Sequence, residues 1–463
     1  MPVVALLAIA FVAFALRAFP FLGADGAWSY RVDYDEGVYF SAAAWMIDGA
    51  LPWRDYVFVH PPGHLLFLVV TSVWTKGSLG IAGAFALSRW IAAIIGAINA
   101  FLVGRVVART PNAPLPAGLI AAAMYATYPE VVQVERGPFM EPLLNLLCLV
   151  LVLLSIRQWK TTRAMVLMGV VAGAALGVKL WAILWVLGVL LTLTTRRERI
   201  TFSIATAVTA TLIIAPFALR NLGEFMQDAL LFHLWRPADG TLEATARLEQ
   251  IVSVRHLASP ILALIAVVVL RRRSGVAGVA WVLTIASFFA SAAWWNQYNA
   301  HLIASEAVLV GLAFIALPER FRMTLVVAAT ASIVASVTHT IRRAASTGEH
   351  LIIARSELGK SSDCLFSFEP AWAIAANRLP PRETGPLVDS YATQLLTAIR
   401  GTGAIKTFAH ANDAFAAVSE VPKGLSTCRY LFIGERAGKQ VSLDSLRLTH
   451  HPMTTAPGFW EHN

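Results

Sequence analysis

The stretch RVDYDEGVYFSAAAW, residues 31–45, follows directly on an apolar segment and places Asp33, Asp35 and Glu36 close together. Acids near the end of a membrane span are costly unless they face water, a cation or a substrate. Two interpretations compete. These acids belong to a solvated loop, or they include a catalytic base at the depth of a lipid headgroup, where a carboxylate can take a proton from an incoming hydroxyl.

The rest of the chain is strongly apolar. Of its 463 residues, 57% are hydrophobic and 14% are charged, whereas soluble domains carry about 25% charged residues. The apolar residues come in blocks of roughly 15–25, the length that spans a bilayer as a helix. The net charge of +9 comes from short basic clusters between these blocks, which indicates membrane topology and no nucleic-acid partner. The sequence therefore predicts an all-α polytopic membrane protein.

The apolar blocks predict roughly eleven transmembrane helices. They cover about residues 3–22, 81–104, 115–130, 142–156, 164–178, 180–194, 201–218, 257–270, 276–293, 302–317 and 323–340. The run 64–74 is shorter, and we expect it to lie at the interface within the first outer loop. The helix that begins near Asp35 is apolar on most sides, and we expect it to lie along the membrane surface.

The basic clusters between the spans set the orientation, because Lys and Arg concentrate in cytoplasmic loops. These clusters are Arg105 and Arg109; Arg157, Lys160 and Arg163; Arg196, Arg197 and Arg199; Arg271, Arg272 and Arg273; and Arg320 and Arg322. All fall on one side, which predicts a cytoplasmic N-terminus. The opposite side carries residues 31–37, 131–141, 220–256, 294–301 and everything after 341. We expect an integral protein of a bacterial plasma membrane, with these segments outside the cytoplasm.

The last part of the chain has a different composition, so we predict a transmembrane domain over 1–341 and a small extracytoplasmic α/β domain over 342–463. Strand-like runs, DCLFSF at 363–368 and CRYLFIG at 428–434, alternate with helical runs, SYATQLLTAIR at 390–400 and NDAFAAV at 412–418. Cys364 and Cys428 each adjoin a strand-like run. Outside the cytoplasm they could form a disulfide, and the alternative is two buried thiols.

Further polar residues gather in the outer segments. LPWRDYVFVHPPGH, 51–64, supplies Arg54 and His60 as anion partners, with a snorkelling arginine and a helix-start histidine as alternatives. VERGPFMEPLLNLL, 133–146, supplies Arg136 and Glu141, although an acid is also favourable at a helix start. Lys179, isolated in GVKLWAILW, indicates a nearby anion such as a phosphate, unless it only snorkels.

The stretch WWNQYNAHLIASE, 294–306, adds hydrogen-bonding groups beside two tryptophans. We place Tyr298 and His301 from this stretch, together with Asp33 and Tyr56, in the lining of the acceptor or substrate site. The loop 220–256 adds His233, Arg236 and Asp239, which no spacing singles out. No Walker loop, GxSxG, HExxH or CxxC pattern occurs in the sequence, so we expect no nucleotide donor.

Taken in order, these motifs resemble the GT-C glycosyltransferases, of the protein-mannosyltransferase and aminoarabinose-transferase type (glycosyltransferase family 39). The likeness covers about residues 1–320. It rests on DYDEGVY at 33–39, RDY with HPPG at 54–63, RGPFMEPL at 136–143 and the span-ending Lys179. The resemblance implies a membrane enzyme that moves a sugar, with inversion, from a polyprenyl-phosphate carrier to a hydroxyl of a lipid, protein or polysaccharide.

The resemblance also implies roles for single residues. Asp35 is the expected base, Glu36 orients it or supports the local structure, and Glu141 helps to place the acceptor or the base. Lys179, with Arg54, His60 and Arg136, is expected to bind the donor phosphate. Where aminoarabinose transferases have Glu-Lys-Pro-Pro, this chain has Val59-His60-Pro61-Pro62, so the acid of a metal site of that kind is missing.

Three alternatives stay open at this stage. The first is that Asp33 or Asp35 holds a divalent ion. We expect no other cofactor. A transporter or flippase of lipid-linked sugars is the second, although its charged groups should lie near mid-membrane in paired halves, and here they gather on the outer face. A catalytically inactive assembly partner with the same fold is the third.

Overall fold

The chain folds into two compact units in a computed structural model, each assembled from three segments of sequence. The first unit comprises Met1–Phe19, Trp90–Ile214 and Gly240–Ala345, and the second comprises Pro20–Arg89, Ala215–Asp239 and Ser346–Asn463. The structure describes residues 2–156, 161–241, 243–252, 258–344, 354–358, 363–379, 388–402, 410–411, 413, 428–432, 450–453 and 459–462.

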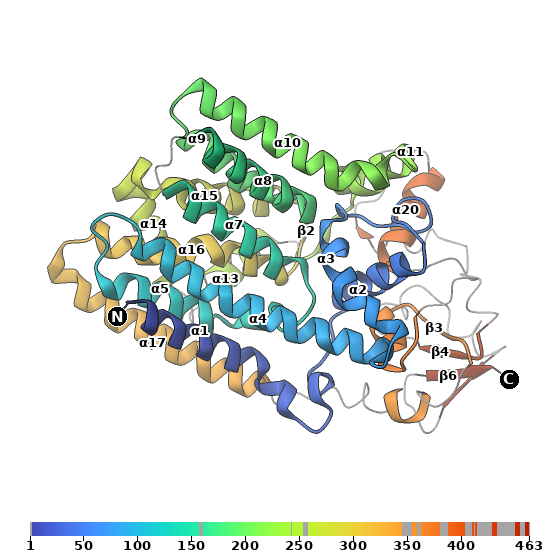
Figure 1. The fold of residues 1–463 in the computed structure, drawn as a ribbon. Helices are drawn as coiled ribbons and strands as arrows, with labels where there is room; N and C mark the ends of the chain where they lie inside the picture. Colours follow the sequence, from blue (N-terminus) through green and yellow to red (C-terminus); the bar gives the residue numbers. More distant parts are fainter. Residues whose placement is uncertain are drawn as a thin grey trace. The chain divides into compact units, whose positions relative to one another are not determined.

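The first unit is built from helices, most of them apolar, and the long ones run side by side (Figure 1). They are α1 (Pro2–Ala18), α4 (Gly80–Ala108), α5 (Leu115–Thr127), α6 (Pro129–Val134), α7 (Met140–Ile156), α8 (Thr162–Val178), α9 (Ile183–Thr192), α10 (Arg196–Ala218), α13 (Ala244–Ile251), α14 (Ala258–Leu270), α15 (Gly275–Ala290), α16 (Gln297–Ala316) and α17 (Glu319–Ala344). The first turns of α4 and the last residues of α10 belong to the second unit. Each predicted span overlaps one of these helices.

Five helices are long and apolar enough to cross a membrane, counted over the described residues. They cover Val3–Leu22, Gly80–Ala108, Arg196–Ala218, Gln297–Ala316 and Glu319–Arg342, and shorter apolar helices cover Leu115–Thr127, Met140–Ile156, Thr162–Val178 and Leu180–Thr192. The predicted class, a helical integral membrane protein, is confirmed. The total of roughly eleven crossings stays a prediction.

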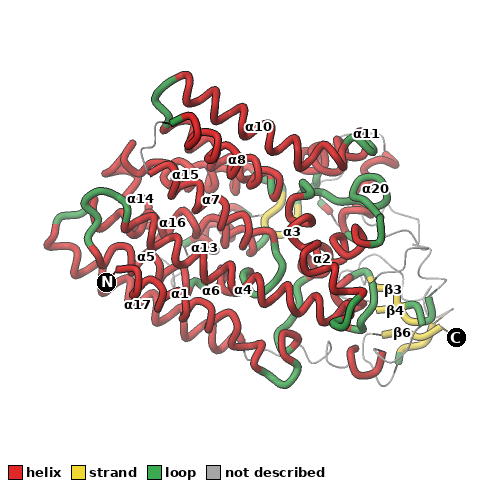
Figure 2. The backbone as a smooth tube through the Cα atoms, in the orientation of Figure 1, coloured by secondary structure: helices red, strands yellow, loops and turns green. Residues whose placement is uncertain are grey.

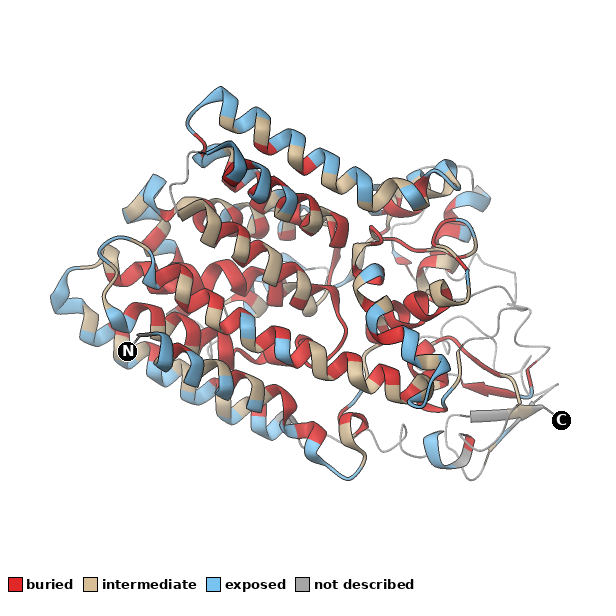
Figure 3. Ribbon diagram, viewed as in Figure 1, coloured by how far each residue is buried: buried red, intermediate tan, exposed pale blue. Residues whose placement is uncertain are grey.

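Helix α16 is the most enclosed of the candidate spans. It packs against α14, α5, α15 and α7 and is buried along most of its length, whereas α10 and α17 expose much of their surface (Figure 3). Most residues of α16 are apolar and occur around the whole helix, which fits such a position. The exposed apolar faces of α10 and α17 suit contact with lipid tails.

The second unit joins the predicted first outer loop to the C-terminal segment. Its elements are α2 (Tyr34–Ile47), α3 (Gly63–Ser72), α11 (Leu222–Phe225), α12 (Phe232–Trp235), α19 (Pro370–Ala375), α20 (Ser390–Thr402), β3 (Leu365–Ser367), β4 (Tyr430–Phe432), β5 (His450–Pro452) and β6 (Phe459–His462). The short strands β1 (Asp239–Gly240) and β2 (Ala293–Trp294) lie elsewhere in the chain. Helices α2 and α3 have 14 and 10 residues, fewer than the roughly 20 needed to span a bilayer.

The sheet of the second unit has the strand order β3-β4-β6-β5 (Figure 2). Strand β3 pairs with β4 in parallel, and the other pairs are antiparallel. The runs DCLFSF and CRYLFIG thus contain strands, and SYATQLLTAIR forms most of α20. The run NDAFAAV, apart from Asp413, lies outside the described residues.

One hydrophobic cluster joins the sheet to the first outer loop. Phe40 from α2 and Phe85 from α4 pack in the same cluster as Leu365 and Phe432 from the strands. Gly37 allows the close approach, because a Cβ atom there would lie 2.4 Å from the backbone nitrogen of Ala371 at the start of α19. The C-terminal segment therefore forms part of the support of α2.

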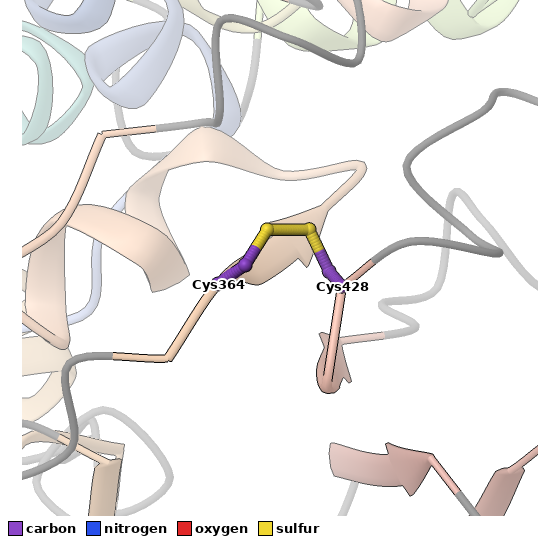
Figure 4. Close-up of a disulfide and its surroundings, with 2 residues drawn as sticks. All are labelled: Cys364 and Cys428. Atoms are coloured by element: carbon purple, nitrogen blue, oxygen red, sulfur yellow. A yellow bond between two sulfur atoms is a disulfide. The ribbon is translucent and has the colours of Figure 1, made fainter.

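The structure bonds Cys364 to Cys428, and Figure 4 shows the pair. Their Cα atoms are 4.8 Å apart, and 64 positions separate them in sequence. The bond lies directly before the paired strands β3 and β4, where Tyr430 donates from its backbone nitrogen to the carbonyl oxygen of Cys364. It therefore ties the two strands together where their pairing begins.

The contact at Gly37 predicts a specific loss of stability. Gly37→Ala should lower the thermal unfolding temperature of the protein in detergent, at a cost of about 1–3 kcal/mol, because backbone atoms of α19 must move. Gly401→Ala is the matched control, since a Cβ there would meet no described atom within 4 Å. Both variants gain helix propensity, so equal unfolding temperatures would contradict the tight packing of α2 on α19.

Candidate active site

The first turn of α2 carries the acids that the sequence singles out. Asp33 is the N-cap residue, and its Oδ1 accepts a hydrogen bond from the backbone nitrogen of Asp35 at 3.2 Å. Glu36 completes a capping box, because its Oε1 accepts from the backbone nitrogen of Asp33 at 3.0 Å. Asp35 lies between them and is half-buried. The helix start therefore fixes the backbone position of Asp35.

Glu36 is buried and paired with Arg89 of α4. The guanidinium donates from Nε to Oε2 at 2.9 Å and from Nη2 to Oε1 at 3.1 Å. Burial raises the pKa of Glu36 above its usual value, and the attraction of Arg89 offsets part of that shift. Glu36 thus holds the helix start in place and is enclosed by protein.

Arg89 also fixes the loop that precedes α2. It donates to the carbonyl oxygens of Ala27 at 2.5 Å, Tyr30 at 3.1 Å and Arg31 at 2.8 Å. Sequence reasoning missed this residue. It is nonetheless the single charge in the apolar block 81–104, and a charge inside such a block requires a partner.

Helix α20 is bound to the start of α2 through Tyr34. The Tyr34 hydroxyl donates to Oδ1 of Asp389 at 3.0 Å and accepts from the backbone nitrogen of Tyr391 at 3.0 Å. Asp389 in turn accepts from the backbone nitrogen of Ala392 in the first turn of α20. The residue directly before Asp35 is thereby held by the C-terminal segment.

The segment between α2 and α3 uses its predicted binding residues in internal contacts. Arg54 pairs with Asp55 at 2.6 Å. The buried hydroxyl of Tyr56 donates to the carbonyl oxygen of Ala42 at 3.0 Å. His60 packs its ring near those of Tyr39 and His233, with centroids 6.0 and 5.6 Å away.

The segment 215–239 is held by α20 at two points. Arg236 pairs with Asp239 at 2.9 Å, and the hydroxyl of Tyr391 donates to the same carboxylate. At the other end of α20, Arg400 pairs with Asp228 at 3.0 Å and also with Glu224. His233 donates from Nε2 to the carbonyl oxygen of Val59 at 2.8 Å.

In the first unit, Lys179 and Glu141 form a buried ion pair. Lys179 Nζ lies 2.5 Å from Glu141 Oε1, and the two residues are 6% and 1% exposed. Lys179 has extended backbone angles between α8 and the short 3-10 helix η4 (Leu180–Ala182). Its ammonium lies 4.9 Å from the ring centroid of Trp181 and 5.0 Å from that of Tyr298, distances typical of cation–π contacts.

Two buried polar residues of α16 have defined partners. His301 Nε2 accepts from Trp185 Nε1 at 3.0 Å, so the ring proton is on Nδ1 and is donated to Asn145 Oδ1 at 2.8 Å. Glu306 accepts from Trp281 Nε1 at 3.0 Å. Glu306 was missed from the sequence, although an acid within a predicted span was a visible signal.

The segment before α7 contains a second buried pair. Arg136 donates from Nη2 to the carbonyl oxygen of Leu16 at 2.8 Å. Its neighbour Glu135 accepts from Arg17 Nε at 2.9 Å and from the hydroxyl of Tyr125 at 2.6 Å. Arg17, alone in its apolar block, was also missed.

Of the predicted site residues that the structure describes in the first unit, Glu141, Lys179, Tyr298 and His301 lie together.

The side chains near α2 do not fit a metal site. Asp33 caps the helix, and both oxygens of Glu36 accept from Arg89. Within the part of the chain that the structure describes, no three His, Cys, Asp or Glu side chains are placed to hold one ion. We therefore assign no metal to Asp33 or Asp35.

Comparisons with known proteins identify the fold. No protein-family model and no curated protein matches the sequence. ArnT from Cupriavidus metallidurans in the apo state matches with a TM-score of 0.62 at 15% identity, over 85% of this chain and 90% of that chain. ArnT bound to undecaprenyl phosphate matches with a TM-score of 0.53 at 17% identity, over 87% and 71%.

An archaeal protein gives a similar result. AglB from Archaeoglobus fulgidus, in complex with an inhibitory peptide and a dolichol-phosphate, matches with a TM-score of 0.61 at 11% identity, over 100% of this chain and 74% of that chain. ArnT is an aminoarabinose transferase and AglB an oligosaccharyltransferase, both with the GT-C fold. The chain therefore has the GT-C fold, and the resemblance inferred from its motifs is confirmed at that level.

The pair of Asp228 and Arg400 predicts a dependence of stability on pH. Burial raises the pKa of Asp228 to about 7, against the opposing attraction of Arg400. Because this pKa lies above that of the unfolded chain, the folded state binds more protons between about pH 4 and 7, and its stability falls as the pH rises through that window. Asp228→Asn should remove this part of the decline.

The check is thermal unfolding from pH 4 to 8. Asp228→Asn should be closest to the wild type in stability at pH 4 and should exceed it by a growing margin as the pH rises, reaching about 2–4 kcal/mol at pH 8. Glu224→Gln is the control, because it removes the more exposed of the two acids that contact Arg400 and should leave the pH dependence in place. An unchanged slope in Asp228→Asn would rule out this group as its source.

Proposed function

We propose that this protein transfers a sugar from a polyprenyl-phosphate carrier to an acceptor hydroxyl on the extracytoplasmic face of the membrane. The observation that carries the proposal is the position of Asp35, half-buried in the first turn of α2 and framed by a capping box and a buried arginine. The solved ArnT and AglB structures support the donor class, since one contains undecaprenyl phosphate and the other dolichol-phosphate.

Asp35 is the general base of the proposed reaction. The acceptor hydroxyl attacks the anomeric carbon of the sugar, and Asp35 takes its proton as the new bond forms. The bond between the anomeric carbon and the phosphate oxygen breaks on the opposite side, so the configuration inverts. Asp33 and Glu36 hold the backbone around Asp35, which keeps the carboxylate at one position relative to α2.

Lys179 stabilises the departing phosphate. A lipid phosphate is already a good leaving group, so the main requirement is to stabilise the negative charge that develops on its oxygen. An ammonium already fixed in position can do this without rearrangement of the site during the reaction. The rings of Trp181 and Tyr298 and the Glu141 carboxylate hold this ammonium in place. The sequence suggested that Glu141 helps to place the acceptor or the base. Because Glu141 contacts Lys179, we propose that it belongs to the phosphate subsite.

The other predicted phosphate ligands receive smaller roles. Arg54 is exposed and paired with Asp55, and Arg136 is bonded to the backbone of α1. His60, partly buried between aromatic rings, contributes mainly to the packing of the segment after α2. The acceptor is a hydroxyl of a lipid, protein or polysaccharide, and the sugar a hexose or pentose.

Asp35→Asn tests the base. Transfer of radiolabelled sugar from a panel of polyprenyl-phosphate sugars, by purified protein in lipid, should fall by about a hundredfold to ten-thousandfold. Asp48→Asn, at the C-cap of the same helix, removes an acid whose surface pair with Lys76 contributes little, and it should keep wild-type activity. Both variants should unfold at the wild-type temperature.

The results distinguish whether the protein catalyses the transfer from whether Asp35 is its base. Full activity in Asp35→Asn would move the base to another residue while keeping the reaction. An absence of transfer by the wild type with every donor and acceptor class of the panel would count against glycosyl transfer and favour transport or a non-catalytic role.

A further inference from the structure

The ion pair of Lys179 and Glu141 raises a question that phosphate binding alone does not answer. A lysine that only binds an anion does not need a buried carboxylate 2.5 Å away, because that carboxylate cancels its charge and repels the ligand. The acid compensates the buried ammonium while no ligand is bound. When a phosphate takes over that role, the carboxylate remains as an additional negative charge beside it.

We propose that Glu141 is a charge-balancing residue of the phosphate subsite, which weakens binding of the product phosphate more than binding of the donor and so promotes product release. This inference rests on the proposed function and deepens it. Glu141 acts through Lys179 and repels the phosphate, so it is a positioning and specificity-determining residue.

The transfer changes the charge of the phosphate that occupies the subsite. The donor is a phosphate diester with one negative charge. When the bond from the anomeric carbon to the phosphate oxygen breaks, the electron pair stays on that oxygen, and the acceptor proton passes to Asp35. The product is a phosphate monoester, whose charge is about −1.5 to −2 at pH 7. Each turnover therefore leaves a more strongly charged anion in the subsite.

Lys179 alone would retain this product in preference to a new donor. Coulomb attraction grows with the charge of the anion, and it is large where protein excludes water. Both side chains are buried. With Glu141 so close to the ammonium, a phosphate bonded to Nζ also lies within a few ångströms of the carboxylate. The repulsion rises with the same charge, so it offsets the added attraction for the monoester.

The position of Lys179 between α8 and η4 helps to fix its distance from Glu141. Lys179 is the C-cap residue of α8, and Glu141 lies in the first turn of α7. Helices α7 and α8 pack against each other along the first unit. The distance between the two charges is therefore set by helix packing, and the aromatic contacts hold the ammonium when a phosphate approaches.

Two ligands that differ in one charge test the proposal. Citronellyl phosphate is a short isoprenyl monoester, and its methyl ester is the matching diester. Calorimetry with the full chain in nanodiscs should show that Glu141→Gln binds the monoester about tenfold more tightly than the wild type, with a smaller gain for the diester. In turnover, the same variant should show stronger inhibition by undecaprenyl phosphate and a lower kcat.

Three further variants complete the design. Lys179→Met should weaken both ligands, and Glu141→Asp, which keeps the charge, should restore the wild-type ratio of the two affinities. Glu319→Gln removes an acid that is 90% exposed at the start of α17, and it should change neither affinity by more than about twofold. Thermal unfolding of each variant shows that the fold is intact.

The outcomes distinguish this inference from the function on which it rests. If Lys179→Met binds both ligands as the wild type does, the phosphate subsite is not at Lys179 and the proposed donor site fails. If Lys179→Met weakens both ligands but Glu141→Gln leaves their ratio unchanged, or binds the monoester more weakly, the donor site stands and the role of Glu141 is overturned.

Discussion

The contact on which the second unit depends is the buried pair of Arg89 and Glu36. A guanidinium has five donors in a rigid plane, and here they bind two carboxylate oxygens of Glu36 and the carbonyl oxygens of three loop residues. Removal of either partner would leave a buried charge uncompensated, a change that costs several kcal/mol. Because the pair fixes both the loop and the first turn of α2, the position of Asp35 is a consequence of it.

The first unit meets the same constraint between apolar helices. Arg17 is paired with Glu135, and Lys179 with Glu141. A charge among such helices is tolerated where another charge or a hydrogen-bonding group compensates it. The two pairs differ in their surroundings. Arg17 also binds two backbone carbonyl oxygens, which suits a structural contact. Lys179 contacts the rings of Trp181 and Tyr298, and this is the pair for which we propose a role in phosphate binding.

Much of the fold could be predicted, because the length and spacing of apolar blocks reflect the bilayer. The pairing of side chains could not. Glu141 and Lys179 are 38 positions apart and received separate roles, since only helix packing brings them together. Arg89 and Arg17 gave a signal as isolated charges in apolar blocks, but nothing in the sequence identifies Glu36 or Glu135 as their partners. The support of α2 by α19 was also hidden, because it depends on a glycine whose missing side chain admits a backbone 2.4 Å from its Cβ position.

The hydrogen bond between Tyr34 and Asp389 also bears on how the protein is made. These residues are 355 positions apart, so at about 5–20 residues per second a ribosome needs roughly 20–70 s to synthesise the second after the first. During that interval α2 lacks the C-terminal residues that pack against it in the finished fold. The region that bears Asp35 therefore matures only after α20 has been made. Contacts of such long sequence separation also slow folding, so the newly made chain spends this period without a complete second unit.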